Sequence, residues 1–99
     1  MKRIKILAVC GFGVGSSMIL KMKIEEVAKE LQVNAEIFTT DVGSATSTPA
    51  DLIFTSQELE KTIKQKSKVP VIGIKNFIDK QEIKNKMLEA LEELKKEGK

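Results

Sequence analysis

Four short apolar segments alternate with longer segments of helical spacing along this chain of 99 residues, and this alternation constrains the fold more than any other feature. The apolar segments are residues 3–9, 34–40, 51–55 and 69–74, each of strand length. Strands that alternate with helices predict an α/β fold, in which an open four-stranded parallel sheet carries helices on both faces. The first segment alternates and then becomes fully apolar, as is typical of a strand buried on both faces. We therefore predict the strand order 2-1-3-4, with the first segment in the middle of the sheet.

Two of the segments between these strands, and the segment after the last strand, have the apolar spacing of amphipathic helices. We expect the first helix to begin at Ser16 or Ser17, either of which would cap it. The second is expected to begin after Ser56, and the third with the capping pattern of Asp79 and Glu82. The apolar residues expected on the buried faces of these helices are Leu20, Ile24, Val27 and Leu31, then Leu59 and Ile63, then Ile83, Met87, Ala90, Leu91 and Leu94.

The composition is that of one folded domain, expected to span residues 1–99, with 41% hydrophobic and 31% charged residues. One cysteine cannot form an internal disulfide, so we expect a cytoplasmic protein. No apolar run reaches the roughly 18 residues of a membrane span, so no direct membrane insertion is expected. The absence of Trp and Tyr, with Lys and Glu interspersed at a net charge of +3, argues against nucleic-acid binding. Residues 41–50, rich in small and polar side chains, are expected to form a loop.

The segment from Ala8 to Ser17, AVCGFGVGSS, contains the only cysteine of the chain and three of its six glycines. It follows the first strand, at the edge where open α/β sheets bind ligands. Alternating glycines allow a tight turn that aims successive backbone N–H groups at an anion, and the following helix N-terminus adds partial positive charge. The same donors would favour the thiolate of Cys10 and lower its pKa, which makes it a nucleophile aimed at phosphorus. The residues expected to form this phosphate-binding loop are Gly11, Phe12, Gly13, Val14, Gly15, Ser16 and Ser17.

Other phosphate-binding patterns fit this loop less well. The glycines at 11, 13 and 15 miss the G-x-G-x-x-G spacing of dinucleotide sites by one position, and the lysine of a P-loop is absent. Low-molecular-weight cysteine phosphatases carry C-x5-R-[ST] in the same strand–loop–helix context, but here Ser16 takes the arginine position. The one arginine, Arg3, lies at the other end of the first strand, so a bidentate clamp on a transferred phosphoryl group is missing. The loop therefore indicates a phosphoryl relay rather than a hydrolase.

The absence of histidine from the chain excludes a Cys–His dyad and a histidine metal site. No metal and no other cofactor is expected. Polar residues are expected where three strands end, and there they would either be solvated loop residues or meet partners. These residues are Asp41, Ser56, Lys75 and Asn76. Met18 and Met22 follow the loop on the first helix. Packing in the core is the default expectation for both, although one exposed methionine could join a docking surface for a partner.

Residues 10–22, CGFGVGSSMILKM, resemble the signature of the IIB component of the bacterial sugar phosphotransferase system (PTS), of the ascorbate type within the lactose/ascorbate/galactitol group. Residues 51–56 and 71–76 resemble the third and fourth strands of that family, although many relatives have arginine in place of Lys75. Residues 41–50 match the family least well.

The resemblance implies a cytoplasmic phosphotransferase with a cysteinyl-phosphate intermediate. Cys10 would accept a phosphoryl group from a phosphohistidine of the IIA component. It would pass that group to a sugar, ascorbate or a related compound, bound by the membrane component IIC. Two alternatives remain open at this point: a cysteine phosphatase or arsenate-reductase-like hydrolase, and a phosphate-binding module without chemistry.

Overall fold

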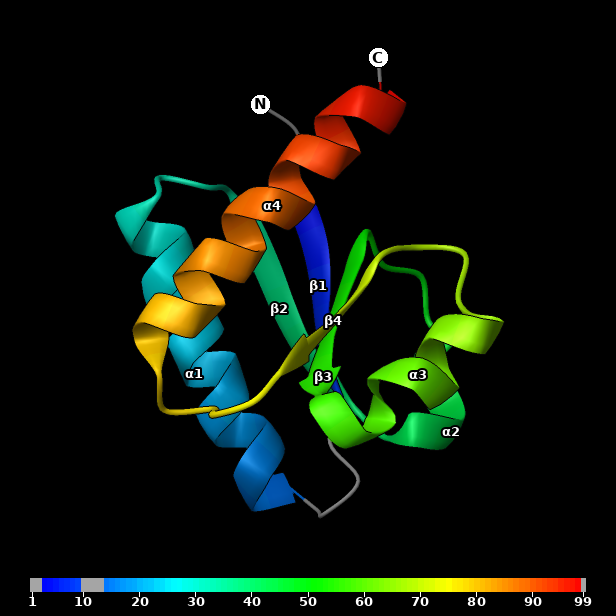
Figure 1. The fold of residues 1–99 in the computed structure, drawn as a ribbon. Helices are drawn as coiled ribbons and strands as arrows, with labels where there is room; N and C mark the ends of the chain where they lie inside the picture. Colours follow the sequence, from blue (N-terminus) through cyan, green and yellow to red (C-terminus); the bar gives the residue numbers. More distant parts are fainter. Residues whose placement is uncertain (1–2, 10–13, 99) are drawn as a thin grey trace.

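Four parallel strands form one sheet in the computed structural model, which describes residues 3–9 and 14–98 (Figure 1). The strands are β1 (Ile4–Val9), β2 (Ala35–Thr40), β3 (Leu52–Ser56) and β4 (Val71–Ile74). Their order is β2-β1-β3-β4, so the predicted order and the central place of the first strand are confirmed. The fourth strand is an edge strand, which suits Pro70 directly before it because proline has no N–H to donate to a neighbouring strand.

Helices cover both faces of this sheet, as predicted (Figure 1). They are α1 (Val14–Glu30), α2 (Val42–Ala45), α3 (Gln57–Lys66) and α4 (Lys80–Gly98). The α1 and α4 helices pack on one face, and α2 and α3 on the other. Each connection leaves a strand at its carboxyl end, so α1 and α3 begin at the same edge of the sheet.

Alternation along β1 divides the core into two layers. Ile6 and Ala8 pack beneath α1 and α4, whereas Leu7 and Val9 pack beneath α3, and all four are fully buried. The larger layer also contains side chains from β3 and both long helices, namely Leu20, Ile24, Val27, Leu52, Phe54, Ile83 and Met87. Burial on both faces explains why β1 reads as a continuous apolar run at its carboxyl half.

The start of the first helix differs from the prediction. The α1 helix begins at Val14, so Ser16 and Ser17 lie in its first turn and neither is its N-cap. The apolar spacing on which the prediction rested starts at Leu20 and does not reach the glycine-rich turn. The predicted start was therefore two or three residues too late, because glycine carries no side chain to reveal the helix period.

Residues 41–50 contain a short helix where a loop was expected. The carboxylate of Asp41 accepts a hydrogen bond of 2.7 Å from the Ser44 backbone N–H, which caps α2. Ala45 on this helix is fully buried against the α3 face of the sheet. Composition pointed to a loop because glycine, serine and alanine carry little apolar periodicity, but a cap and one buried alanine suffice for a single turn.

The α1 helix ends with a left-handed residue. Gln32 has φ of 57°, its N–H donates to the Lys29 carbonyl, and the Val33 N–H donates to the Ala28 carbonyl at 2.8 Å. This is the hydrogen-bonding pattern of a Schellman motif, in which glycine is the usual left-handed residue. The chain thus holds a glutamine in a backbone conformation that costs an L-residue free energy.

The connection between β4 and α4 is organised by one carboxylate. The Asp79 side chain accepts from the Glu82 N–H at 3.2 Å, which confirms half of the predicted capping pattern. The Glu82 carboxylate, however, does not return to Asp79. It accepts the backbone N–H groups of Lys75 at 2.7 Å and Asn76 at 3.0 Å. Glu82 therefore fixes the residues that directly follow β4.

Candidate functional site

The predicted nucleophile and the first part of its loop lie outside the described residues. These are Cys10, Gly11, Phe12 and Gly13. Val14, Gly15, Ser16 and Ser17 form the first turn of α1. Since β1 ends at Val9 and α1 begins at Val14, the segment with the cysteine joins the carboxyl end of a central strand to a helix N-terminus.

The strand register shows which residues surround this exit from β1. Val9 pairs with Thr40 at the end of β2 and with Thr55 near the end of β3. Ser56, the last residue of β3, pairs in turn with Ile74 at the end of β4. The carboxyl edge of the sheet thus carries hydroxyl side chains from the two strands that flank β1.

The four polar residues predicted at strand ends do lie there, but two of them have evident structural tasks. Asp41 follows β2 and caps α2. Lys75 and Asn76 follow β4 and are exposed, and the Asn76 side chain accepts a hydrogen bond of 3.1 Å from the Ile78 N–H. Ser56 ends β3 and precedes α3, yet its side chain makes no capping hydrogen bond.

Two hydroxyl groups at the end of β3 are buried without a hydrogen-bond partner in the part of the chain that the structure describes. They are Thr55 Oγ1 and Ser56 Oγ, and Thr55 is fully buried. Sequence reasoning missed Thr55, which it treated as part of an apolar strand. A polar residue at the carboxyl end of a central strand was the signal that could have identified it.

Met18 and Met22 are exposed, contrary to the expectation that they pack in the core. They are four residues apart and therefore share one face of α1, with Ile19, also exposed, beside them. The buried face of the helix is formed instead by Leu20, Ile24 and Val27. The first half of α1 thus presents apolar side chains to solvent close to the helix start.

The clearest electrostatic feature lies away from this edge. Lys80 at the start of α4 contacts Glu30 and, at 3.7 Å, Glu26, both in the last turns of α1. The hydrogen bond from Lys80 lowers the pKa of the Glu30 carboxyl, and the same bond raises the pKa of Lys80. Glu26 is twelve residues from the start of α1, roughly 18 Å along the helix, so this cluster joins two helices and does not belong to the site.

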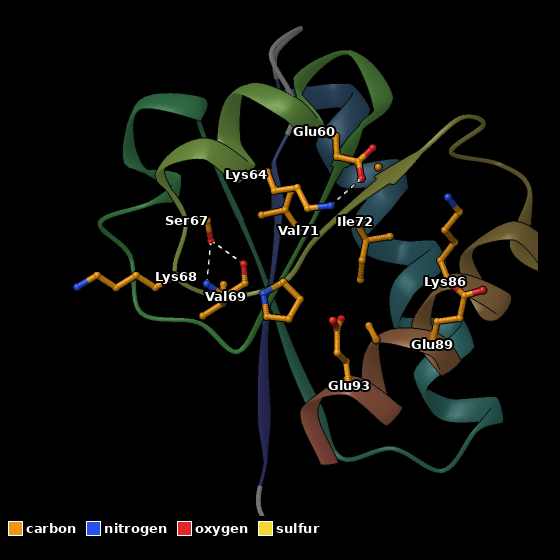
Figure 2. A pocket seen from close by; sticks show the side chains of 13 residues that line it. Glu60, Lys64, Ser67, Lys68, Val69, Val71, Ile72, Lys86, Glu89 and Glu93 are labelled. Carbon is orange, nitrogen blue, oxygen red and sulfur yellow. Dashed lines mark hydrogen bonds and ion pairs between the residues drawn. The ribbon is translucent and has the colours of Figure 1, made fainter. Parts of the chain in front are cut away.

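A cavity of about 400 Å³ lies along the outer side of β4, between α3 and α4 (Figure 2). Its walls are charged, with Glu60 and Lys64 of α3 at 3.9 Å from each other and Lys86 and Glu89 on α4. The Glu60 side chain lies so close to Gly73 that a Cβ at this position would overlap with it. This cavity follows the flank of an edge strand and is separate from the candidate site.

Two kinds of feature are absent from residues 3–9 and 14–98. Across these residues no helix has both the length and the apolar content that crossing a membrane requires. No cluster of three Cys, Asp or Glu side chains able to hold a metal ion occurs among them either.

Comparison with known proteins connects this geometry to a family. Residues 5–89 match the model of the family described as "PTS system, Lactose/Cellobiose specific IIB subunit". The chain is 33% identical over 92 residues to the ascorbate-specific PTS system EIIB component of Mycoplasma pneumoniae, covering 91% of this chain and 97% of that protein. The proteins of the same name from Salmonella typhimurium and Escherichia coli O157:H7 are also 33% identical over 92 residues, covering 91% of either chain.

Among solved structures, the fold is similar to that of the lactose-specific IIB component domain of the PTS from Streptococcus pneumoniae. The TM-score is 0.64 at 20% identity, covering 92% of this chain and 97% of that one, so this likeness supports the fold alone. The family match and the identity over most of the chain confirm the resemblance seen in the sequence. The chain belongs to the IIB subunit family of the bacterial phosphotransferase system, a family of phosphotransferases.

Proposed function

We propose that this protein is a phosphocarrier in which Cys10 holds the phosphoryl group during sugar uptake. The observation that carries the proposal is the place of the only cysteine, directly after buried strand β1 and before α1, in a chain of the IIB family. We propose that it works in the cytoplasm as one domain of residues 1–99. Its partners would be a IIA component as donor and a membrane IIC component that presents the sugar.

The proposed transfer has two steps. The Cys10 thiolate attacks phosphorus of a phosphohistidine on IIA, the S–P bond forms, the P–N bond breaks, and its electron pair stays on the imidazole. A sugar hydroxyl then attacks phosphorus, the S–P bond breaks with its pair returning to the thiolate, and the hydroxyl proton leaves to solvent or to a base near the sugar. Phosphoryl transfer needs mainly positioning and charge stabilisation. The backbone N–H groups of residues 11–17 would supply both.

The histidine of the first step would have to lie on the partner, because this chain has none. The start of α1 favours a negative group beside it through the helix dipole. Met18 and Met22 would belong to the face that IIA contacts, since exposed methionines near a site pack readily against partners. Partners that bind in alternation require a small interface rather than a permanent one.

The proposed substrate is ascorbate or a related compound. Its support is the name shared by relatives that are about one third identical over nine tenths of the chain. Radiolabelled ascorbate uptake in cells that carry the matching IIC, with and without this protein, tests the substrate separately from the chemistry.

The chemistry is tested by intact mass after incubation with phosphoenolpyruvate, the general PTS proteins and a candidate IIA. We expect a gain of one phosphoryl group that requires IIA and is lost in Cys10→Ser. The exposed Ser47→Ala, far from β1 in sequence, serves as the control and should gain the group like the wild type. A wild type that gains nothing with several IIA proteins but hydrolyses a phosphate ester would instead support a phosphatase. Full function in Cys10→Ser would support a binding module.

A further inference from the structure

The hydroxyl groups of Thr55 and Ser56 are the strongest unexplained feature of the molecule. Both oxygens are buried, and neither has a hydrogen-bond partner in the described part of the chain. Most buried polar groups in folded proteins are hydrogen-bonded, so each exception needs a reason. Two such exceptions at adjacent positions at the end of one central strand suggest that a ligand supplies the missing partner.

Their position relative to β1 identifies where that ligand would lie. Thr55 pairs with Val9, the last residue of β1, and Cys10 is the next residue in the chain. Ser56 is the next position on β3 after this last pair. Because side chains alternate along a strand, Thr55 lies on the α3 face of the sheet, with Ile53, and Ser56 on the α1 face, with Phe54. The two hydroxyls therefore border the exit of β1 from both faces.

Local structure does not explain either hydroxyl. Ser56 stands at the N-cap position of α3, where a serine side chain usually accepts a helix N–H, but it makes no such bond. The Thr55 side chain is fully buried on the face of the sheet that carries Val9 and Ile53, where a valine of similar volume would leave no unpaired oxygen. A phosphoryl group has three oxygens that accept hydrogen bonds, and hydroxyls of this kind are suitable donors.

We propose that Thr55 and Ser56 are positioning residues of the phosphate site, donating hydrogen bonds from β3 to the anion held beside Cys10. This rests on the proposed function, in that it takes Cys10 as the carrier, and it adds donors outside the glycine-rich loop. The site is then formed by both central strands and not by one loop alone.

The experiment measures protection of Cys10 from iodoacetamide by inorganic phosphate, in the full-length protein and without any PTS partner. Thr55→Val and Ser56→Ala remove the hydroxyls, Thr55→Ser and Ser56→Thr keep them, and exposed Thr62→Val is the matched control. We expect the phosphate concentration for half-protection to rise roughly tenfold when a hydroxyl is lost, because hydrogen bonds to charged groups have effects of this size. The conservative variants and the control should stay within about twofold of the wild type. Thermal unfolding of each variant distinguishes loss of a donor from loss of folded protein.

A rise in either hydroxyl-deleted variant with rescue by its conservative partner supports the proposal. Equal half-protection in all variants overturns it, and so does a wild type that phosphate does not protect. Neither of these two results bears on the carrier function, because phosphorylation through IIA tests that function separately. Conversely, a failure of phosphorylation with intact hydroxyl-dependent protection would overturn the carrier function alone.

Discussion

Removal of the Glu82 carboxylate should loosen the connection between β4 and α4. Glu82 accepts the N–H groups of Lys75 and Asn76, which directly follow β4 at the same edge of the sheet as the proposed site. In Glu82→Ala both N–H groups lose their acceptor. In Glu82→Gln one carbonyl oxygen remains, but the charge is lost and an amide N–H₂ faces the other donor.

The magnitude follows from the geometry. Hydrogen bonds to a charged group contribute roughly 1.5–3 kcal/mol when shielded from water. Glu82 is partly exposed, so we take about 1 kcal/mol for each of the two bonds, at the level of an average hydrogen bond. Glu82→Ala should then lower the free energy of unfolding by about 2 kcal/mol, and Glu82→Gln by about 1 kcal/mol. For a domain of this size, each 1 kcal/mol corresponds to roughly 4–8 °C in Tm.

The assay is urea unfolding followed by circular dichroism at 222 nm, because the chain has no Trp or Tyr for fluorescence. Glu92→Gln, exposed on the same helix, is the matched control and should change stability by less than about 0.5 kcal/mol. Two results would refute the reasoning. One is a loss below about 0.5 kcal/mol in Glu82→Ala, and the other is Glu82→Gln unfolding like the wild type.

Four further substitutions have predictable effects on stability. Phe54→Ala should cost about 3–5 kcal/mol because Phe54 is fully buried, whereas Phe38→Ala, at a phenylalanine that is 40% exposed, should cost much less; urea unfolding of the pair checks this. Gln32→Gly should raise the free energy of unfolding by up to about 1 kcal/mol, and Tm with it, because φ at this position is 57°. A lower Tm would show that the glutamine side chain contributes more to stability than the backbone strain costs. Glu30→Gln should lower stability slightly at neutral pH and low salt. The hydrogen bond from Lys80 lowers the pKa of the Glu30 carboxyl in the folded state, so its contribution is present above the unfolded pKa and is lost as pH falls through the folded value; equal Tm of wild type and variant at pH 7 would contradict it.

The sheet was predictable because its signal is strong and redundant. The β1 strand is apolar on both faces, as a central parallel strand needs to be. This pattern predicted its place in the middle of the sheet, between β2 and β3. Helices with a clear apolar period, such as the last one behind Asp79, were also found near their true bounds. The start of α1 and the short helix α2 were not predicted, because glycine, serine and alanine leave no apolar period to follow.

The candidate site was predictable only in part, for a different reason. A nucleophile stands out when it is unique, as Cys10 is in this chain. Thr55 does not stand out, because threonine has a high propensity for strands. Within an apolar strand, a threonine that serves a site cannot be told from one that only packs in the core. Its significance depends on register with Val9 and on an unpaired oxygen, and both are properties of the folded chain.

The central place of β1 and β3 has a consequence for how the molecule opens. Backbone amides of these inner strands are paired on both sides, and the core beneath them includes the fully buried Leu7 and Phe54. Amide hydrogen exchange should therefore be slowest in these two strands and approach the rate set by global unfolding, while β2 and β4 exchange earlier through partial opening. Fraying at either margin would then leave the pairing of β1 with β3 intact, and with it the proposed phosphate site. Variants that weaken β2 or β4 would then change how long the protein survives in the cell more than how fast each surviving molecule transfers phosphate.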